Sequence, residues 1–197
     1  NVFGSGLSLQ QEEALKFLFA YMPLNDLADY DGDFFLANAN IALKTRKESP
    51  WGKDIPEEIF LHYVLPFGIF YENLDSFRIA YYDEIQGRVK GMDATDAALE
   101  INHWCHEKVT YQLVPASGGR NTGPVSTILS AEGRCGMLSI FTVASLRTAG
   151  IPARKVSAVW AHMDDDHAWV EVWIDGKWYY MEACEPEPVL DSRVWFT

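Results

Sequence analysis

Three residues in the second half of the chain have the side-chain types that a nucleophilic acyl-transfer site needs: Cys135, His167 and Glu182. A cysteine attacks as its thiolate, a histidine takes the thiol proton, and a carboxylate orients the imidazole and stabilises its charged form. Cys135 follows Gly133-Arg134 and opens a stretch with helical periodicity. The positive end of a helix lowers a thiol pKa from its ordinary value of about 8.5. We therefore expect Cys135 to be the nucleophile.

The spacing of His167 and Glu182 predicts that they share one face of a sheet. Asp175-Gly176 is a strong signal for a two-residue hairpin turn, and in that register Glu182 lies opposite Trp169 and diagonal to His167. Facing residues, and residues two apart on one strand, point to the same side, within about 7–8 Å along the diagonal. A slip of one residue would put the two side chains on opposite faces.

Each of these residues also has an ordinary structural interpretation. A single cysteine is most often a small buried apolar residue, and a carboxylate near a hairpin usually faces water. The combination of all three favours catalysis over these separate interpretations.

Two other clusters contain residue types that bind metals. One is His103, Cys105 and His106, and the other is His162 with the acidic run 164–166. Neither has the spaced pairs of Cys and His that are typical of structural zinc sites. We expect no metal site and no cofactor, and the acidic run is as consistent with a solvated turn as with the mouth of the site.

The elements that must position these residues indicate an α+β fold. Apolar periodicity, caps and prolines predict helices over about 9–22, 34–47, 56–64, 77–90, 94–108 and 135–149. A Gly-, Ser-, Thr- and Pro-rich stretch over 111–130 predicts a long loop, and strands are expected over 153–160, 168–174 and 177–183. We divide the chain into a helical N-terminal portion, 1–92, and a catalytic core, 93–197.

Composition excludes several classes of protein. The net charge of −12 comes from 28 acidic and 16 basic residues without a basic cluster, so nucleic acid is not an expected partner. No apolar run approaches the roughly 18–20 residues of a membrane span. Three widely spaced cysteines do not form a disulfide framework. Because the chain begins at Asn1, we expect that it can be part of a larger chain.

Three segments, taken in order, resemble the core of the transglutaminase-like superfamily. They are Glu132–Gly136, Ala144–Arg154 and His167–Val172, and the resemblance extends over about residues 98–190. It implies a papain-like fold in which a Cys-bearing helix packs on an antiparallel sheet. It also implies nucleophile and base roles for Cys135 and His167. Glu182 stands where many relatives, including peptide N-glycanases, have an aspartate.

The resemblance further implies the oxyanion donors and the reaction class. The backbone N–H of Cys135 would be one donor and, by similarity to relatives with an upstream tryptophan, Trp104 the second, although Trp104 suits a core position equally well. We expect hydrolysis of a peptide or amide bond in a peptide or protein substrate through a thioester. The alternatives are amine transfer to protein glutamine and a catalytically silent module that binds peptide or carbohydrate. Similarity to exported bacterial relatives favours the cell envelope, periplasm or secretion.

Overall fold

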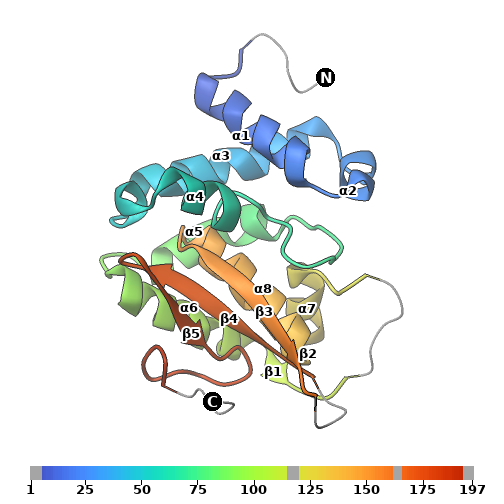
Figure 1. The fold of residues 1–197 in the computed structure, drawn as a ribbon, viewed down its shortest axis with the longest axis vertical. Helices are drawn as coiled ribbons and strands as arrows, with labels where there is room; N and C mark the ends of the chain where they lie inside the picture. Colours follow the sequence, from blue (N-terminus) through green and yellow to red (C-terminus); the bar gives the residue numbers. More distant parts are fainter. Residues whose placement is uncertain (1–5, 115–119, 162–165, 193–197) are drawn as a thin grey trace.

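The structure is a computed structural model and describes residues 6–114, 120–161 and 166–192. It has an α+β fold with a helical first half, as predicted, and the strands of the antiparallel sheet come last in the chain (Figure 1). The helices are α1 (Leu9–Tyr21), α2 (Leu24–Asp29), α3 (Gly32–Glu48), the 3₁₀ turn η1 (Gly52–Asp54), α4 (Glu57–Tyr63), α5 (Phe77–Arg88), α6 (Ala94–Lys108), α7 (Pro124–Ser130) and α8 (Cys135–Thr148). The strands are β1 (Thr110–Tyr111), β2 (Glu132–Gly133), β3 (Ala153–Val159), β4 (Asp166–Ile174) and β5 (Lys177–Met181).

The N-terminal helices form where capping signals predict them. Ser8 caps α1 in a capping box with Gln11, Asp31 caps α3, and Asp93 caps α6. Each cap satisfies a backbone N–H that the first helical turn leaves without a partner. Helices α1 to α4 lie together at one end of the molecule (Figure 1). They enclose a hydrophobic cluster formed by Ala14, Leu18, Ala39, Ala42, Ile55, Phe60, Val64 and Leu65.

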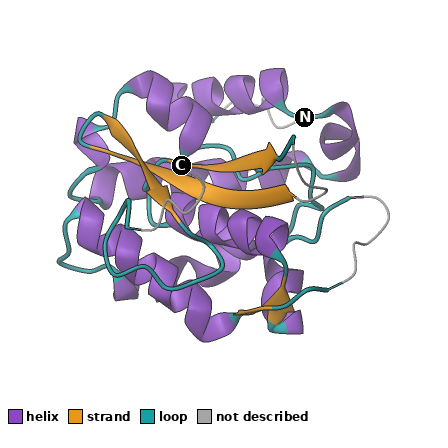
Figure 2. Ribbon diagram, turned by 60° about the horizontal axis from the view of Figure 1, so that its bottom comes forward, coloured by secondary structure: helices purple, strands orange, loops and turns teal. Residues whose placement is uncertain are grey.

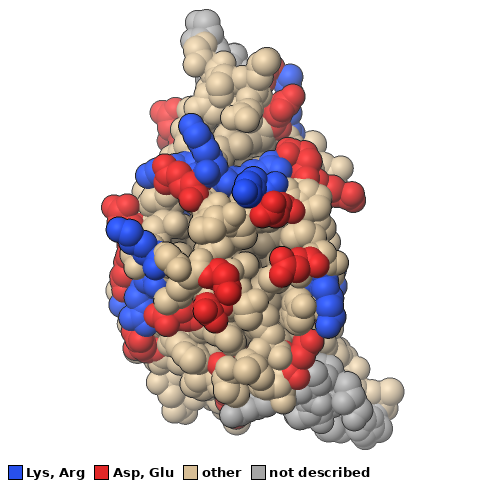
Figure 3. Space-filling model, turned by 90° about the vertical axis from the view of Figure 1, so that its left-hand side faces the viewer, with Lys and Arg blue, Asp and Glu red and all other residues tan. Residues whose placement is uncertain are grey.

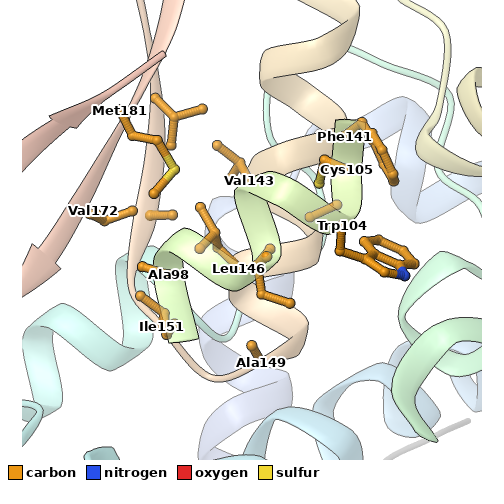
Figure 4. Close-up of a cluster of buried hydrophobic side chains, with 14 of the residues drawn as sticks. Ala98, Trp104, Cys105, Phe141, Val143, Leu146, Ala149, Ile151, Val172 and Met181 are labelled. Atoms are coloured by element: carbon orange, nitrogen blue, oxygen red, sulfur yellow. The ribbon is translucent and has the colours of Figure 1, made fainter. Parts of the chain in front are cut away.

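A larger hydrophobic cluster lies between helices α5, α6 and α8 and the sheet. Figure 4 shows Val172 and Met181 of the sheet directed toward Val143 of α8, all three fully buried. Phe77 and Ile85 of α5 belong to this same cluster. The division of the chain at residue 92 stays a prediction, and in the structure α5 packs with the elements that follow it.

Two buried arginines connect the N-terminal layer to the rest of the chain. Arg78 of α5 donates to the carbonyl of Val64 at 2.7 Å. Arg147, near the end of α8, donates to the carbonyls of Pro66 at 2.9 Å and Ala153 at 3.0 Å. Buried guanidinium groups need such acceptors, because an unpaired buried charge is costly. The segment after α4 is therefore fixed against both the Cys-bearing helix and the start of β3.

The antiparallel sheet has the strand order β3-β4-β5, and β4 pairs with β5 in the predicted register. Asp175 and Gly176 adopt φ angles of 51° and 84°, as a turn with two positive φ values requires. Ile174 faces Lys177, and the pairing continues to Val170 opposite Met181. Figure 2 shows these strands in the middle of the molecule with helices on either side.

The prediction of a loop over 111–130 is partly wrong. Its last third is helix α7, which begins at Pro124 and ends at Ser130, and the C-cap residue Ala131 has a positive φ of 57°. Proline at a first helical position starts a helix, so the Gly123-Pro124 pair marks an N-terminus. A second unpredicted feature is a short parallel pairing, in which Thr110 faces Glu132 and Tyr111 faces Gly133. This pairing fixes the chain just before Cys135.

Charged side chains on the face shown in Figure 3 are of both signs and interspersed, without an extended basic patch. Within the described part of the chain, no helix has the length and apolar character needed to cross a bilayer.

Candidate active site

Helix α8 presents Cys135 at its N-terminus. The helix begins at Cys135, and Arg134, its N-cap, makes no side-chain capping bond. The first N–H groups of a helix carry partial positive charge, and here they lie next to the thiol. From Leu138 to Thr148 every residue of α8 is buried, whereas Cys135 itself is only half-buried. The thiol thus lies on a firmly packed helix but at its partly exposed end.

His167 and Glu182 meet as the register requires. His167 lies near the start of β4, Glu182 comes directly after β5, and their Nε2 and Oε2 atoms are 3.0 Å apart. Their side chains are 13% and 5% exposed, so water screens the pair little. The bond to Glu182 occupies Nε2, which leaves the other ring nitrogen for a second partner.

That second partner is Cys135. Burial raises the pKa of Cys135, but hydrogen bonds with His167 and with the backbone N–H of Ala168 outweigh burial and leave the thiol pKa below its ordinary value. The same contact with Cys135, together with Glu182, raises the pKa of His167 to about 9. Both shifts favour a thiolate–imidazolium pair at neutral pH.

The Glu182 carboxylate has donors on both oxygens. Oε1 accepts the backbone N–H groups of Ala183 at 2.9 Å and Cys184 at 3.0 Å. Oε2 accepts the Tyr180 hydroxyl at 2.6 Å in addition to His167. Burial alone would raise the pKa of Glu182, yet the bonds from His167, Tyr180 and Cys184 lower that pKa to about 2. The carboxylate is therefore charged at any working pH.

The backbone of Glu182 is held by two buried polar side chains that the sequence did not indicate. Asn102 of α6 donates to the Glu182 carbonyl at 2.8 Å, and Glu187 accepts the Glu182 N–H at 3.2 Å. The two side chains are joined, because the N–H of Glu187 donates to the Asn102 amide oxygen at 2.8 Å. Both are fully buried. In the sequence, Glu187 is one residue of an acidic tail, and no local pattern separates it from its solvated neighbours.

Cys135 and His167 line a cleft of about 590 Å³. Its other lining residues are Tyr111, Leu113, Val114, Arg134, Trp160, Asp166, Glu182, Cys184 and Glu185. The lining thus combines apolar and aromatic side chains with charged ones. A cleft of this size accommodates an extended peptide segment next to the thiol.

The structure does not support Trp104 as an oxyanion donor. Its indole N–H donates to Glu84 at 2.9 Å, its ring is fully buried against Tyr81 and Phe141, and it does not line the cleft. Figure 4 shows Trp104 beside Phe141 within the hydrophobic cluster. Its core position, the alternative considered above, is the one observed, since α6 turns this flank toward α5 and α8.

The His- and Cys-containing cluster on α6, in which the sequence predicts no metal site, has side chains with separate contacts. Cys105 is buried against Ser145, and burial raises its pKa to about 12. His103 contacts the carbonyl of Glu187 at 2.8 Å. No group of three or more His, Cys, Asp and Glu side chains is placed to hold a metal ion in the described ranges. His162 and residues 164–165 lie outside those ranges.

Comparison with known proteins gives related chains in bacteria. A protein of unknown function from Mycobacterium leprae is 26% identical over 102 residues, which are 46% of this chain and 36% of that protein. The structure of a candidate cysteine protease from Cytophaga hutchinsonii superposes with a TM-score of 0.51 at 20% identity, covering 72% of this chain and 48% of that one. A candidate protease from Parabacteroides distasonis gives a TM-score of 0.45 at 19% identity, over 78% of this chain and 27% of that one.

The chain therefore spans only about a third to a half of the similar proteins from Mycobacterium and Cytophaga, and the structural likeness concerns the fold. The model of the transglutaminase-like superfamily matches residues 83–183, just over half of the chain, from within α5 to just past Glu182. With its Cys-bearing helix packed on an antiparallel sheet, this chain belongs to the transglutaminase-like superfamily.

Proposed function

We propose that this protein is a cysteine-nucleophile hydrolase that cleaves a peptide or amide bond through a thioester. Cys135 would be the nucleophile, His167 the acid and base, and Glu182 the carboxylate that orients the imidazole. The observation that carries the proposal is the continuous hydrogen-bonded chain from Cys135 through His167 to Glu182, lying at a cleft large enough for a peptide. Such a chain meets the requirement of an activated nucleophile with an oriented base.

Acylation would begin from the thiolate–imidazolium pair. The Cys135 sulfur attacks the carboxamide carbon, the carbonyl π electrons move to oxygen, and a tetrahedral oxyanion forms. The backbone N–H of Cys135, at the helix N-terminus, is the proposed donor to that oxygen. His167 then gives its proton to the leaving nitrogen as the carbon–nitrogen bond breaks, which leaves a thioester and releases an amine.

Deacylation reverses these roles. Neutral His167 takes a proton from water, the water oxygen attacks the thioester carbon, and the carbon–sulfur bond breaks to return the thiolate and an acid. Throughout both steps the carboxylate of Glu182 stays charged, because the pKa of this group is lowered to about 2. The Glu182 charge therefore stabilises each imidazolium that forms.

Site-resolved labelling with iodoacetamide at pH 7 tests the nucleophile. We expect Cys135 to react at least about 100-fold faster than Cys105, because the one thiol pKa is lowered and the other is raised to about 12. Mass spectrometry of the digested protein follows each cysteine separately. Equal rates at the two positions would favour a catalytically silent binding module.

The reaction itself is tested with a peptide library, with and without a primary amine, using wild type and Cys135→Ala. Cleavage that is lost in the variant supports hydrolysis. Incorporation of the amine at glutamine in place of cleavage would replace hydrolysis with amine transfer, which uses the same thioester.

A further inference from the structure

We infer that Tyr180 is a positioning residue of this site: its buried hydroxyl fixes the Glu182 carboxylate so that one oxygen faces His167. The inference rests on the proposed function, since it assigns a role within that triad. It adds a fourth side chain that acts on the nucleophile through two others and does not itself contact a substrate.

The contact has the geometry of a strong hydrogen bond. The Tyr180 hydroxyl lies 2.6 Å from Oε2 of Glu182, the same oxygen that lies 3.0 Å from His167. The distance of 2.6 Å is typical of an O–H group that donates to a carboxylate. The two residues are two apart in sequence, so the alternation that brings Glu182 to the His167 face also brings Tyr180 there.

The protein fixes the position of Tyr180 itself. The residue is 7% exposed, and its ring lies 6.2 Å from that of Trp169 between centroids. Its backbone is paired on both sides with Asp191, which accepts the Tyr180 N–H at 2.7 Å and donates to the Tyr180 carbonyl at 3.1 Å. Because the ring is buried and the backbone makes two hydrogen bonds, the hydroxyl is held in one position. Little conformational entropy is then lost when it donates to a partner.

Charge determines which group donates. Glu182 is ionised and can only accept, so the Tyr180 hydroxyl is the donor. Burial and the neighbouring Glu182 both raise the pKa of Tyr180, which keeps the phenol protonated. The hydroxyl therefore remains a donor wherever the thiolate–imidazolium pair exists.

A glutamate at this position needs such a donor more than an aspartate would. The extra methylene adds a rotatable bond, and a carboxylate on a longer stem has more orientations that miss the imidazole. The N–H groups of Ala183 and Cys184 hold Oε1, and Tyr180 holds Oε2. With both oxygens held, the longer side chain is confined to the orientation that His167 requires.

The experiment measures the iodoacetamide rate of Cys135 against pH in wild type and Tyr180→Phe. The rate at Cys135 reports the thiolate, and its dependence on pH reports the range over which the thiolate–imidazolium pair exists. In Tyr180→Phe we expect the rate at pH 7 to fall about 3- to 10-fold, because one bond to a charged group is lost. We also expect the pH range to narrow at both ends, with the Cys135 pKa higher and the His167 pKa lower.

Two controls separate positioning from a general structural effect. Tyr179→Phe removes a hydroxyl from the adjacent residue, whose ring packs on the hydrophobic cluster, and should leave the pH range unchanged. In a Glu182→Gln background, Tyr180→Phe should have little further effect, because residues that act through one another are not additive.

The outcomes are distinct. An unchanged pH range in folded Tyr180→Phe, or a range that widens as His167 holds its proton more tightly, would overturn the positioning role and leave the triad intact. A wild-type Cys135 without any enhanced rate would instead overturn the proposed function.

Discussion

Two regions of this molecule each contain a cysteine close to histidines, and they differ in every property that matters for reactivity. In the last turn of α6, Cys105 is fully buried against Ser145, and burial raises its pKa to about 12. At the start of α8, Cys135 is half-buried beside His167, and its pKa is lowered. The residue types are alike, so helix position and a charged partner decide which thiol can act as a nucleophile.

The histidines of the two regions differ in the same sense. Burial lowers the pKa of His106 on α6, which favours the neutral ring. The pKa of His167 is raised to about 9, first by the bond with Cys135 and then by Glu182. His106 is a half-buried histidine whose pKa favours the neutral ring, whereas His167 lies between a thiol and a carboxylate, the setting that an acid–base group needs.

The largest expected effect is the loss of the nucleophile. Cys135→Ala should lower the turnover of any substrate found in the peptide library by at least about 10⁴-fold, as in other enzymes that lose a covalent nucleophile. Cys105→Ala should keep activity and destabilise the fold by about 1–2 kcal/mol through the cavity it leaves. Steady-state kinetics and urea unfolding measure the two effects. Comparable losses of turnover in both variants would remove the distinction between the two regions.

Next in size is the loss of the charge on Glu182. Glu182→Gln keeps the shape of the side chain but not its negative charge, so the imidazolium is stabilised less; we expect kcat to fall about 10²- to 10⁴-fold. The control is Glu185→Gln, a carboxylate that also lines the cleft, which should change kcat by less than about threefold. A Glu182→Gln enzyme with full activity would show that His167 needs no carboxylate.

The pH dependence should be the next effect. Protonated His167 stabilises the thiolate and supplies the proton for the leaving amine, and its pKa is raised to about 9. Activity should therefore persist into mildly alkaline solution and fall about tenfold per unit once the pH exceeds that value. At the acidic end, activity should fall as the Cys135 thiolate is protonated, below the ordinary thiol range. If activity instead began to fall near pH 6.5 as the pH is raised, His167 would not be paired with Cys135.

The smallest expected effect concerns Trp104. Trp104→Phe removes the indole N–H that donates to Glu84 and leaves a smaller ring among Tyr81 and Phe141. We expect a loss of stability of about 1–3 kcal/mol, measured by chemical unfolding, with kcat within about twofold of wild type. A large loss of kcat in a protein of unchanged stability would restore Trp104 to the oxyanion site.

Local signals in the sequence determined the elements and the register that bring the candidate residues together. The Ser8 capping box, Asp93 and the Gly150-Ile151-Pro152 stop each act within one helical turn, so their effect can be predicted from neighbouring residues. The Asp175-Gly176 turn acts in the same way on β4 and β5. It fixes which residues face each other, and this is why the contact between His167 and Glu182 was predictable.

The tertiary structure alone decided how Glu182 is held and where Trp104 lies. Asn102 and Glu187 are separated from each other by 85 positions, and they meet because α6 contacts the segment that follows β5. The indole N–H of Trp104 donates to Glu84 across the contact between α5 and α6. Such pairings depend on how whole elements pack, and periodicity shows which face of an element is buried but not which side chain it meets. The sequence could therefore predict the candidate triad, whereas the contacts of Asn102 and Glu187 with Glu182 depend on the packing of distant segments.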